Sequence, residues 1–138
     1  ISTIPGAGAA GGLGAGMMAF LNGELRSGVD IILETVSLDS KLESADLVIT
    51  GEGGMDFQTI YNKAPIGVAR MAKKRGIPTI GISGTLGRDF QVVHDYGIDA
   101  ALSIVNGPIT LEAASTNAAK LISEAVEQSL RYFRYRLP

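Results

Sequence analysis

Apolar residues in this chain form short uninterrupted runs, which alternate with longer segments where apolar residues recur every three or four positions. The short runs predict β-strands at residues 30–36, 47–50, 79–83 and 100–105. The periodic segments predict helices at residues 17–21, 37–45, 65–75, 88–96 and 110–133. Beyond the opening segment, strands and helices therefore alternate along the chain.

The predicted strands are apolar on both faces, as in Leu47, Val48 and Ile49. This pattern is typical of a parallel sheet that is covered by helices on both sides. We therefore expect an α/β fold, with an open, mostly parallel sheet of about four strands in a Rossmann-like three-layer arrangement. No internal repeat or interdomain linker interrupts the 138 residues, so residues 1–138 are expected to form a single α/β segment.

The composition argues against several classes of function. The net charge is −2 and no basic patch is present, so nucleic acid is not an expected partner. The absence of cysteine excludes disulfides, thiolate metal sites and a cysteine nucleophile. No apolar run approaches the roughly 20 residues of a transmembrane helix, so we expect no membrane partner. The chain also opens at Ile1 without a methionine, and we expect a piece of a longer protein.

Polar, glycine-containing stretches follow three of the predicted strands, at residues 51–59, 83–87 and 106–108. In an open parallel α/β sheet, ligands bind just beyond the carboxyl ends of the strands. The first stretch is the richest in chemistry, because it combines two carboxylates, an amide and a hydroxyl group. We therefore expect a ligand to bind where the strand at residues 47–50 ends.

Each polar side chain of this first stretch has more than one possible role. Asp56 suits a general base toward a hydroxyl group or a ligand of Mg²⁺, and it suits equally an N-cap of the following turn. Glu52 suits a Mg²⁺ ligand acting through water, or an acceptor for N–H groups of the loop. Gln58 and Thr59 can bind oxygen atoms of a substrate or phosphate, or can cap the next helix.

Lys63 lies two residues before Pro65, which is the predicted first residue of a helix. An exposed cation near the positive end of a helix dipole is unfavourable by a few tenths to about 1 kcal/mol. A bound phosphate would reverse the sign of this interaction. Lys63 is therefore a candidate phosphate-binding residue, and a lysine that points into solvent is the alternative.

The opening glycines have competing interpretations. The spacing of Gly6, Gly8 and Gly11 suits backbone amides that bind phosphate, and it also suits a tight turn. The same spacing matches a dinucleotide fingerprint, in which Glu34 would bind ribose and the chain would be an oxidoreductase fragment. Only residues 1–4 remain for the strand that must precede such a fingerprint, and Pro5 interrupts it. A non-catalytic α/β ligand-binding module is a further alternative.

The single histidine, His94, does not indicate a catalytic centre. Its predicted place near a helix C-terminus suits a surface group that the helix dipole stabilises. One histidine without cysteine argues against a zinc site. A Ser-His-Asp triad built on Ser83 would lack the G-x-S-x-G elbow.

Several of these motifs together resemble the bacterial glycerate kinases of the type I family. The resemblance rests on residues 51–59, 62–65 and 67–69, with further support from residues 6–14, 80–84 and 93–100. It runs the length of the chain, which corresponds to roughly the C-terminal third of such a kinase. It implies a two-domain α/β protein of the cytoplasm that phosphorylates D-glycerate with ATP and Mg²⁺, in a cleft between its domains.

The resemblance also implies which residues form the site. An active-site loop would contain Gly6, Gly8, Gly11 and Gly12, and the cleft would be lined by Glu52, Asp56, Gln58, Thr59 and Lys63. We expect Asp56 to activate the glycerate hydroxyl or to hold Mg²⁺ with Glu52, and Lys63 to neutralise phosphate charge. Two positions depart from the family pattern: Gly54 stands where an arginine is usual, and Asn62 stands where a glycine is usual.

A cleft between two domains needs both of its walls. The chain is therefore expected to be inactive alone and to depend on the missing N-terminal part of the same polypeptide. The sequence does not indicate an oligomeric state, nor whether the product is 2- or 3-phosphoglycerate.

Overall fold

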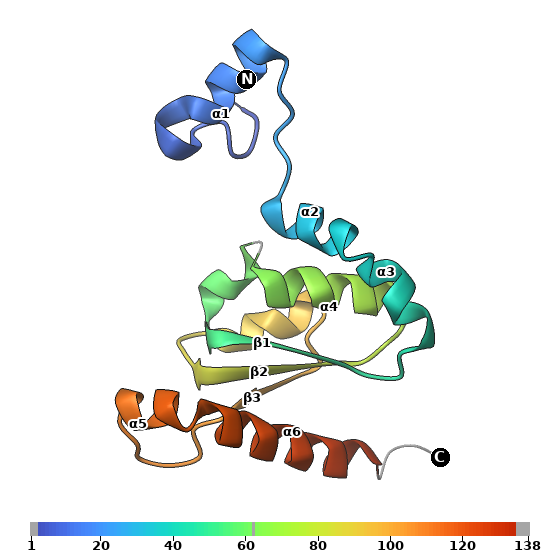
Figure 1. Ribbon diagram of the computed structural model, residues 1–138, viewed down its shortest axis with the longest axis vertical. Helices are drawn as coiled ribbons and strands as arrows, with labels where there is room; N and C mark the ends of the chain where they lie inside the picture. Colours follow the sequence, from blue (N-terminus) through green and yellow to red (C-terminus); the bar gives the residue numbers. More distant parts are fainter. Residues whose placement is uncertain (1–2, 62, 135–138) are drawn as a thin grey trace.

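The computed structural model describes residues 3–61 and 63–134, in which a parallel three-stranded sheet is covered by helices on both faces (Figure 1). The strands lie in the order β1 (Val48–Met55), β2 (Thr79–Leu86) and β3 (Ala100–Ser103). Helix α4 (Ala64–Lys74) covers one face, and helices α5 (Leu111–Thr116) and α6 (Ala118–Arg134) lie on the other. The predicted α/β class and three-layer arrangement are confirmed.

Apolar side chains fill the space on both sides of this sheet. Under α4 and beside it, two clusters of buried residues join the helix to the strands: Met55, Ile66, Ala69, Val93 and Ile98 in one, and Leu42, Val48, Ala72 and Ile77 in the other. On the opposite face, Ala125 of α6 packs against Ile82 and Ile104. The sheet therefore has a core on each face, which explains why its strands are apolar throughout.

Most of the predicted helices are present. Residues 37–45 form α3 (Leu38–Lys41) and the 3-10 helix η1 (Leu42–Ser44), and residues 88–96 form the 3-10 helix η3 (Phe90–Tyr96). The predicted long last helix is divided at Asn117 into α5 and α6. The Asn117 side-chain amide and backbone N–H both donate to the Ala113 carbonyl oxygen, at 2.8 and 3.1 Å, which satisfies the end of α5.

The strand predicted at residues 30–36 is wrong. This segment is a helix, α2 (Gly28–Thr35), so the sheet has three strands within the described residues instead of about four. Ser27 caps the helix by accepting a hydrogen bond from the Asp30 backbone N–H at 3.5 Å, and Asp30 lies favourably in the first turn. Leu33 is buried where α2 lies against Gly67 of α4, whereas Ile31 and Ile32 remain exposed.

Strand β1 is longer than its apolar residues predict. It continues through the glycine-containing stretch as far as Met55, which pairs with Leu86 of β2. Glycine allows the strands to approach closely here, because a Cβ atom at Gly51 would collide with the Ile82 carbonyl oxygen. Residues 51–55 are therefore strand, and the turn that follows β1 begins only at Asp56.

The first helix, α1 (Ala9–Leu21), lies away from the sheet, and residues 22–27 connect it to the rest of the chain (Figure 1). Its predicted end is confirmed, because Asn22 caps it in the left-handed conformation. Its beginning is irregular: Ala10, Gly11 and Gly12 have positive φ angles of 50°, 67° and 90°. No residue of α1 is buried in the described structure.

Candidate active site

The turn that follows β1 gathers the polar side chains that the sequence singles out. Asp56 caps the 3-10 helix η2 (Phe57–Ile60), because its Oδ1 accepts a hydrogen bond from the Gln58 backbone N–H at 2.8 Å. The Asp56 backbone N–H in turn donates to Thr59 Oγ1 at 3.0 Å. Thr59 Oγ1 donates to Glu52 Oε1 at 2.8 Å, and Lys63 Nζ lies 3.5 Å from Glu52 Oε2. One connected network thus joins β1, the turn and the start of α4.

Two backbone hydrogen bonds hold this turn against the end of β2. The Phe57 N–H donates to the Arg88 carbonyl oxygen at 3.1 Å, and the Gly87 N–H donates to the Met55 carbonyl oxygen at 2.7 Å. Met55 and Thr59 are completely buried. The backbone that carries Asp56 is therefore anchored on both sides, so its carboxylate has a defined position.

Thr59 occupies the centre of the network. Its hydroxyl group has no exposed surface and uses its hydrogen for Glu52, while it accepts from the Asp56 N–H. The two hydrogen bonds do not compete, because a hydroxyl group can donate one hydrogen and accept another at the same time. Thr59 therefore orients Glu52 relative to the turn. The neighbouring Gln58 lies at the surface of η2 and is accessible from solvent.

Glu52 and Lys63 form an ion pair at the N-terminus of α4. Lys63 is the N-cap residue of that helix, where the dipole alone disfavours a cation. Glu52 supplies the opposite charge, and its side chain is 18% exposed while that of Lys63 is 39% exposed. The ammonium group thus remains accessible from one side, and an anion that approaches it meets the helix N-terminus as well.

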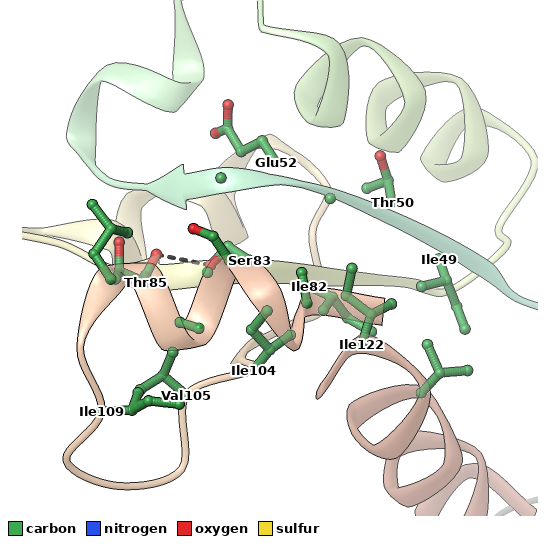
Figure 2. A pocket seen from close by; sticks show the side chains of 18 residues that line it. Ile49, Thr50, Glu52, Ile82, Ser83, Thr85, Ile104, Val105, Ile109 and Ile122 are labelled. Atoms are coloured by element: carbon green, nitrogen blue, oxygen red, sulfur yellow. Dashed lines mark hydrogen bonds between the residues drawn. The ribbon is translucent and has the colours of Figure 1, made fainter. Parts of the chain in front are cut away.

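A groove of about 740 Å³ lies between the sheet and helices α5 and α6 (Figure 2). Its walls are mainly apolar and come from several elements: Ile49, Ile82, Ile104, Ile109, Leu111 and Ile122. Figure 2 shows Thr50 and Glu52 on the other side of β1, away from these isoleucines. The sequence pattern does not predict this groove, because its lining residues are far apart in the chain. The apolar face of the predicted last helix is the one related signal in the sequence.

The opening glycines do not join this network in the described structure. Gly6, Gly8, Gly11 and Gly12 lie in and before α1, apart from the carboxyl ends of the strands (Figure 1). A Cβ atom at Gly8, Gly11 or Gly12 would meet no other heavy atom within 4 Å. Packing therefore does not require glycine at these three positions. The positive φ angles at Gly11 and Gly12 do favour it.

Glu34 lies on helix α2, not at the end of a strand. Both of its carboxylate oxygens accept hydrogen bonds of 2.6 Å from Arg26 Nη2, and these bonds raise the pKa of Arg26. A ribose-binding acid of a dinucleotide site belongs at a strand end. The structure therefore removes the basis for the oxidoreductase alternative.

The remaining candidate centres have structural roles. His94 Nδ1 lies 2.8 Å from the Ile98 carbonyl oxygen at the end of η3. Ser83 is buried and donates its hydroxyl hydrogen to the Thr85 carbonyl oxygen at 2.8 Å. Asn62, which departs from the family pattern, lies outside the described residues.

Carboxylate oxygens are the ligands that Mg²⁺ prefers, and Glu52 of β1 and Asp56 of the following turn could supply them. Across residues 3–61 and 63–134, no group of three or more His, Cys, Asp or Glu side chains gathers in one place. Mg²⁺ in phosphoryl-transfer sites is commonly held by one or two carboxylates together with substrate phosphates. Glu52 and Asp56 are therefore candidates for a shared metal site, and they do not form a cage for the metal by themselves.

The model of the glycerate kinase family matches residues 1–134. The chain is 48% identical over 131 residues to a glycerate kinase of Bacillus cereus, covering 95% of this chain and 33% of that protein. It is 48% identical to glycerate 2-kinase of Escherichia coli K12, covering 91% of this chain and 33% of the relative.

A solved structure gives the same comparison in three dimensions. A crystal structure of a protein assigned as glycerate kinase 2 from Salmonella typhimurium LT2 superposes with a TM-score of 0.67 at 41% sequence identity. The match covers 94% of this chain and 34% of that one. The chain thus spans about a third of the length of the relatives it matches.

Among the described helices, none is both long and apolar enough to cross a membrane.

Proposed function

Because this chain belongs to the glycerate kinase family, we propose that the full-length protein is a two-domain cytoplasmic kinase that transfers the γ-phosphoryl group of ATP to a hydroxyl group of D-glycerate. Residues 1–138 would contribute one wall of the active-site cleft. The observation that supports this proposal most is the network of Glu52, Asp56, Thr59 and Lys63 at the carboxyl end of β1. That edge of a parallel sheet is where ligands bind in open α/β folds.

In this proposal Asp56 is the general base. Its carboxylate accepts the proton of the glycerate hydroxyl group, whose oxygen forms a bond to the γ-phosphorus while the bond from that phosphorus to the bridging oxygen of ADP breaks. The anchored turn keeps the carboxylate in place before substrate arrives. Positioning of this kind supplies most of the catalysis in phosphoryl transfer.

Lys63 stabilises the negative charge of the transferring phosphoryl group. Its ammonium group lies at the N-terminus of α4, so the charge and the helix dipole act on the same anion. Glu52 holds the lysine at this position while leaving part of it accessible. The amides of Gly6, Gly8, Gly11 and Gly12 would add to this charge neutralisation once the rest of the protein places α1 against the cleft.

Glu52 is the residue that would hold Mg²⁺, joined by Asp56 if that carboxylate binds the metal instead of acting as the base. The ion supplies neutralisation of charge on the phosphate oxygens when it is bound. Gln58, exposed at the surface of η2, is the candidate for a hydrogen bond to the substrate. Of the site residues that the sequence analysis singled out, Thr59 alone is completely enclosed, so its contribution is to orient Glu52.

The test uses the full-length enzyme with Asp56→Asn and Lys63→Ala. Each substitution is expected to lower kcat/KM for glycerate by about 10²-fold or more, the usual contribution of a positioned acid–base or charged group. Lys73→Ala removes the same ammonium group from the other end of α4 and serves as the control. Near-normal turnover in both site variants would show that these roles are wrong, and ATP binding without any turnover by the wild type would favour a non-catalytic module.

A further inference from the structure

Strand β1 is covered on one face only. Helix α4 packs against β1 on the side to which Thr50 and Glu52 point. On the other side α6 contacts β2, and the apolar groove lies open beneath β1. Strand β1 is also an edge strand, because the strand order of the described sheet is β1-β2-β3. One edge and most of one face of the strand therefore lack a neighbour among the described residues.

The residues around this opening are apolar and unusually exposed. Ile49 of β1 is 38% exposed, Ile122 of α6 is 46% exposed and Leu111 of α5 is 83% exposed. Glu52, the charged residue at the groove, points to the other side of β1 (Figure 2). A nucleotide phosphate or a small organic acid would find no counter-charge there, whereas apolar side chains of a protein segment would bury this surface favourably.

The length of the related proteins indicates what that segment is. Relatives about 48% identical to this chain are about three times as long, so two thirds of such a protein lies outside residues 1–138. An exposed flat edge strand is a site for pairing with another strand. We propose that a strand from this remaining part of the full-length protein pairs with the free edge of β1 and that apolar side chains beside it fill the groove. This inference does not depend on the chemistry proposed for the turn after β1.

Hydroxyl-radical footprinting of the full-length protein, without nucleotide or glycerate, tests the proposal directly. Side chains at Ile49, Leu111 and Ile122 are expected to be oxidised at least several-fold more slowly than their exposure in residues 1–138 implies. Oxidation at the rate of freely exposed side chains would overturn the proposal. Protection that appears only at high protein concentration would identify a second copy as the occupant, and protection that requires added ATP would identify the nucleotide; either result overturns the proposal.

A pair of neighbouring substitutions on α6 gives an independent test. Ile122→Arg places a charge in the groove, and Ser123→Arg places the same charge on an exposed residue that does not line it. In the full-length protein, Ile122→Arg is expected to lower the Tm by about 5 °C or more, and Ser123→Arg by no more than about 1–2 °C. Equal Tm values for the two variants would contradict the proposal. If Ile122→Arg does not fold, the footprint of the wild type decides.

Discussion

At the scale of single residues, the position of the Glu52 carboxylate depends on one buried hydroxyl group. Thr59 is enclosed, and its Oγ1 connects a side chain of β1 with the backbone of the turn that carries Asp56. Groups that orient a reacting or ligand-binding side chain typically affect activity 10- to 100-fold when they are removed. On the proposed function, Thr59 is therefore a positioning residue, which acts on the substrate only through Glu52.

Replacement of Thr59 by valine keeps the shape and removes the hydroxyl group. The Glu52 carboxylate then loses a donor and the Asp56 N–H loses its acceptor, so we expect kcat to fall by about tenfold or more with little change in the KM for glycerate. Steady-state kinetics of the full-length enzyme measure this. Thr59→Ser retains the hydroxyl group and should restore most of the activity; a serine variant as slow as the valine variant would argue for a purely steric role.

At the scale of elements, the pairing of β1 with β2 depends on a close approach of their backbones. A Cβ atom at Gly51 would collide with the Ile82 carbonyl oxygen, and a backbone contact of this kind cannot be relieved by moving a side chain. Gly51→Ala is therefore expected to destabilise the protein by roughly 2 kcal/mol or more. Thermal unfolding of the full-length protein measures the loss, and Gly107→Ala is the control, because a Cβ atom there meets nothing within 4 Å. Equal Tm values for the two variants would refute the expectation.

An ion pair links α3 to the end of α4. Arg75 Nε and Nη2 lie 3.0 and 2.8 Å from the two Asp39 oxygens, and this hydrogen bonding lowers the pKa of Asp39 below its usual value of 3.8. Because the folded pKa lies below the unfolded one, the pair stabilises the protein above pH 3.8, and the effect is lost as the pH falls through the folded pKa. Asp39→Asn should therefore lower the Tm slightly at about pH 7 and make no difference once the carboxylate is protonated. A Tm difference that grows on acidification would contradict this sign.

The elements also show what sequence patterns can and cannot predict here. The strands and helices predicted after residue 46 are present, because apolar runs and capping residues such as Pro65 agree with the packing. Their bounds differ in places: β1 and β2 run further than predicted, and the last helix is divided at Asn117. Residues 30–36 were misassigned, since Ile31, Ile32 and Val36 favour a strand while the cap at Ser27 and the contact with Gly67 favour a helix. The packing of this segment against α4 favours the helix over the strand, and a short apolar run in a sequence does not reveal such packing.

Four of the predicted polar site residues lie together in the structure, whereas the opening glycines lie apart from them and the hydrogen bonds between the four were not predicted. The sequence places Glu52, Asp56, Thr59 and Lys63 near one strand end, and the structure brings them together. The continuation of β1 to Met55 was hidden by glycines, which usually indicate a loop. The hydrogen bond from Thr59 to Glu52 spans seven residues and depends on that continuation.

At the scale of the whole molecule, the described structure is one part of a longer protein. It spans about a third of its relatives, and α1 has no buried residue. Phe20 and Leu21 of α1 are also exposed apolar side chains. On the inference drawn above, they have the same explanation as the open groove beneath β1, namely neighbours in the rest of the full-length protein. On that inference, part of the surface of residues 1–138 is buried in the full-length protein.

Purified residues 1–138 are accordingly expected to show no glycerate phosphorylation above background, because half of the proposed cleft is missing. A coupled assay for ADP release, with the full-length enzyme measured in parallel, checks this. Circular dichroism of the same sample establishes whether the sheet and helices are formed. Measurable turnover by the fragment would show that one wall suffices.

The charges at the end of β1 and on the turn that follows have a consequence for the order of binding events. Glu52 and Asp56 contribute two carboxylates and Lys63 one ammonium group, so acid is in excess. Position 54 lies two residues after Glu52 on β1 and faces the same side, and a glycine there contributes no guanidinium group. The excess carboxylate offsets part of the attraction that Lys63 and the N-terminus of α4 exert on a polyanion. On the proposed function, a nucleotide that carries its own neutralising cation therefore enters this site more favourably than an uncomplexed one.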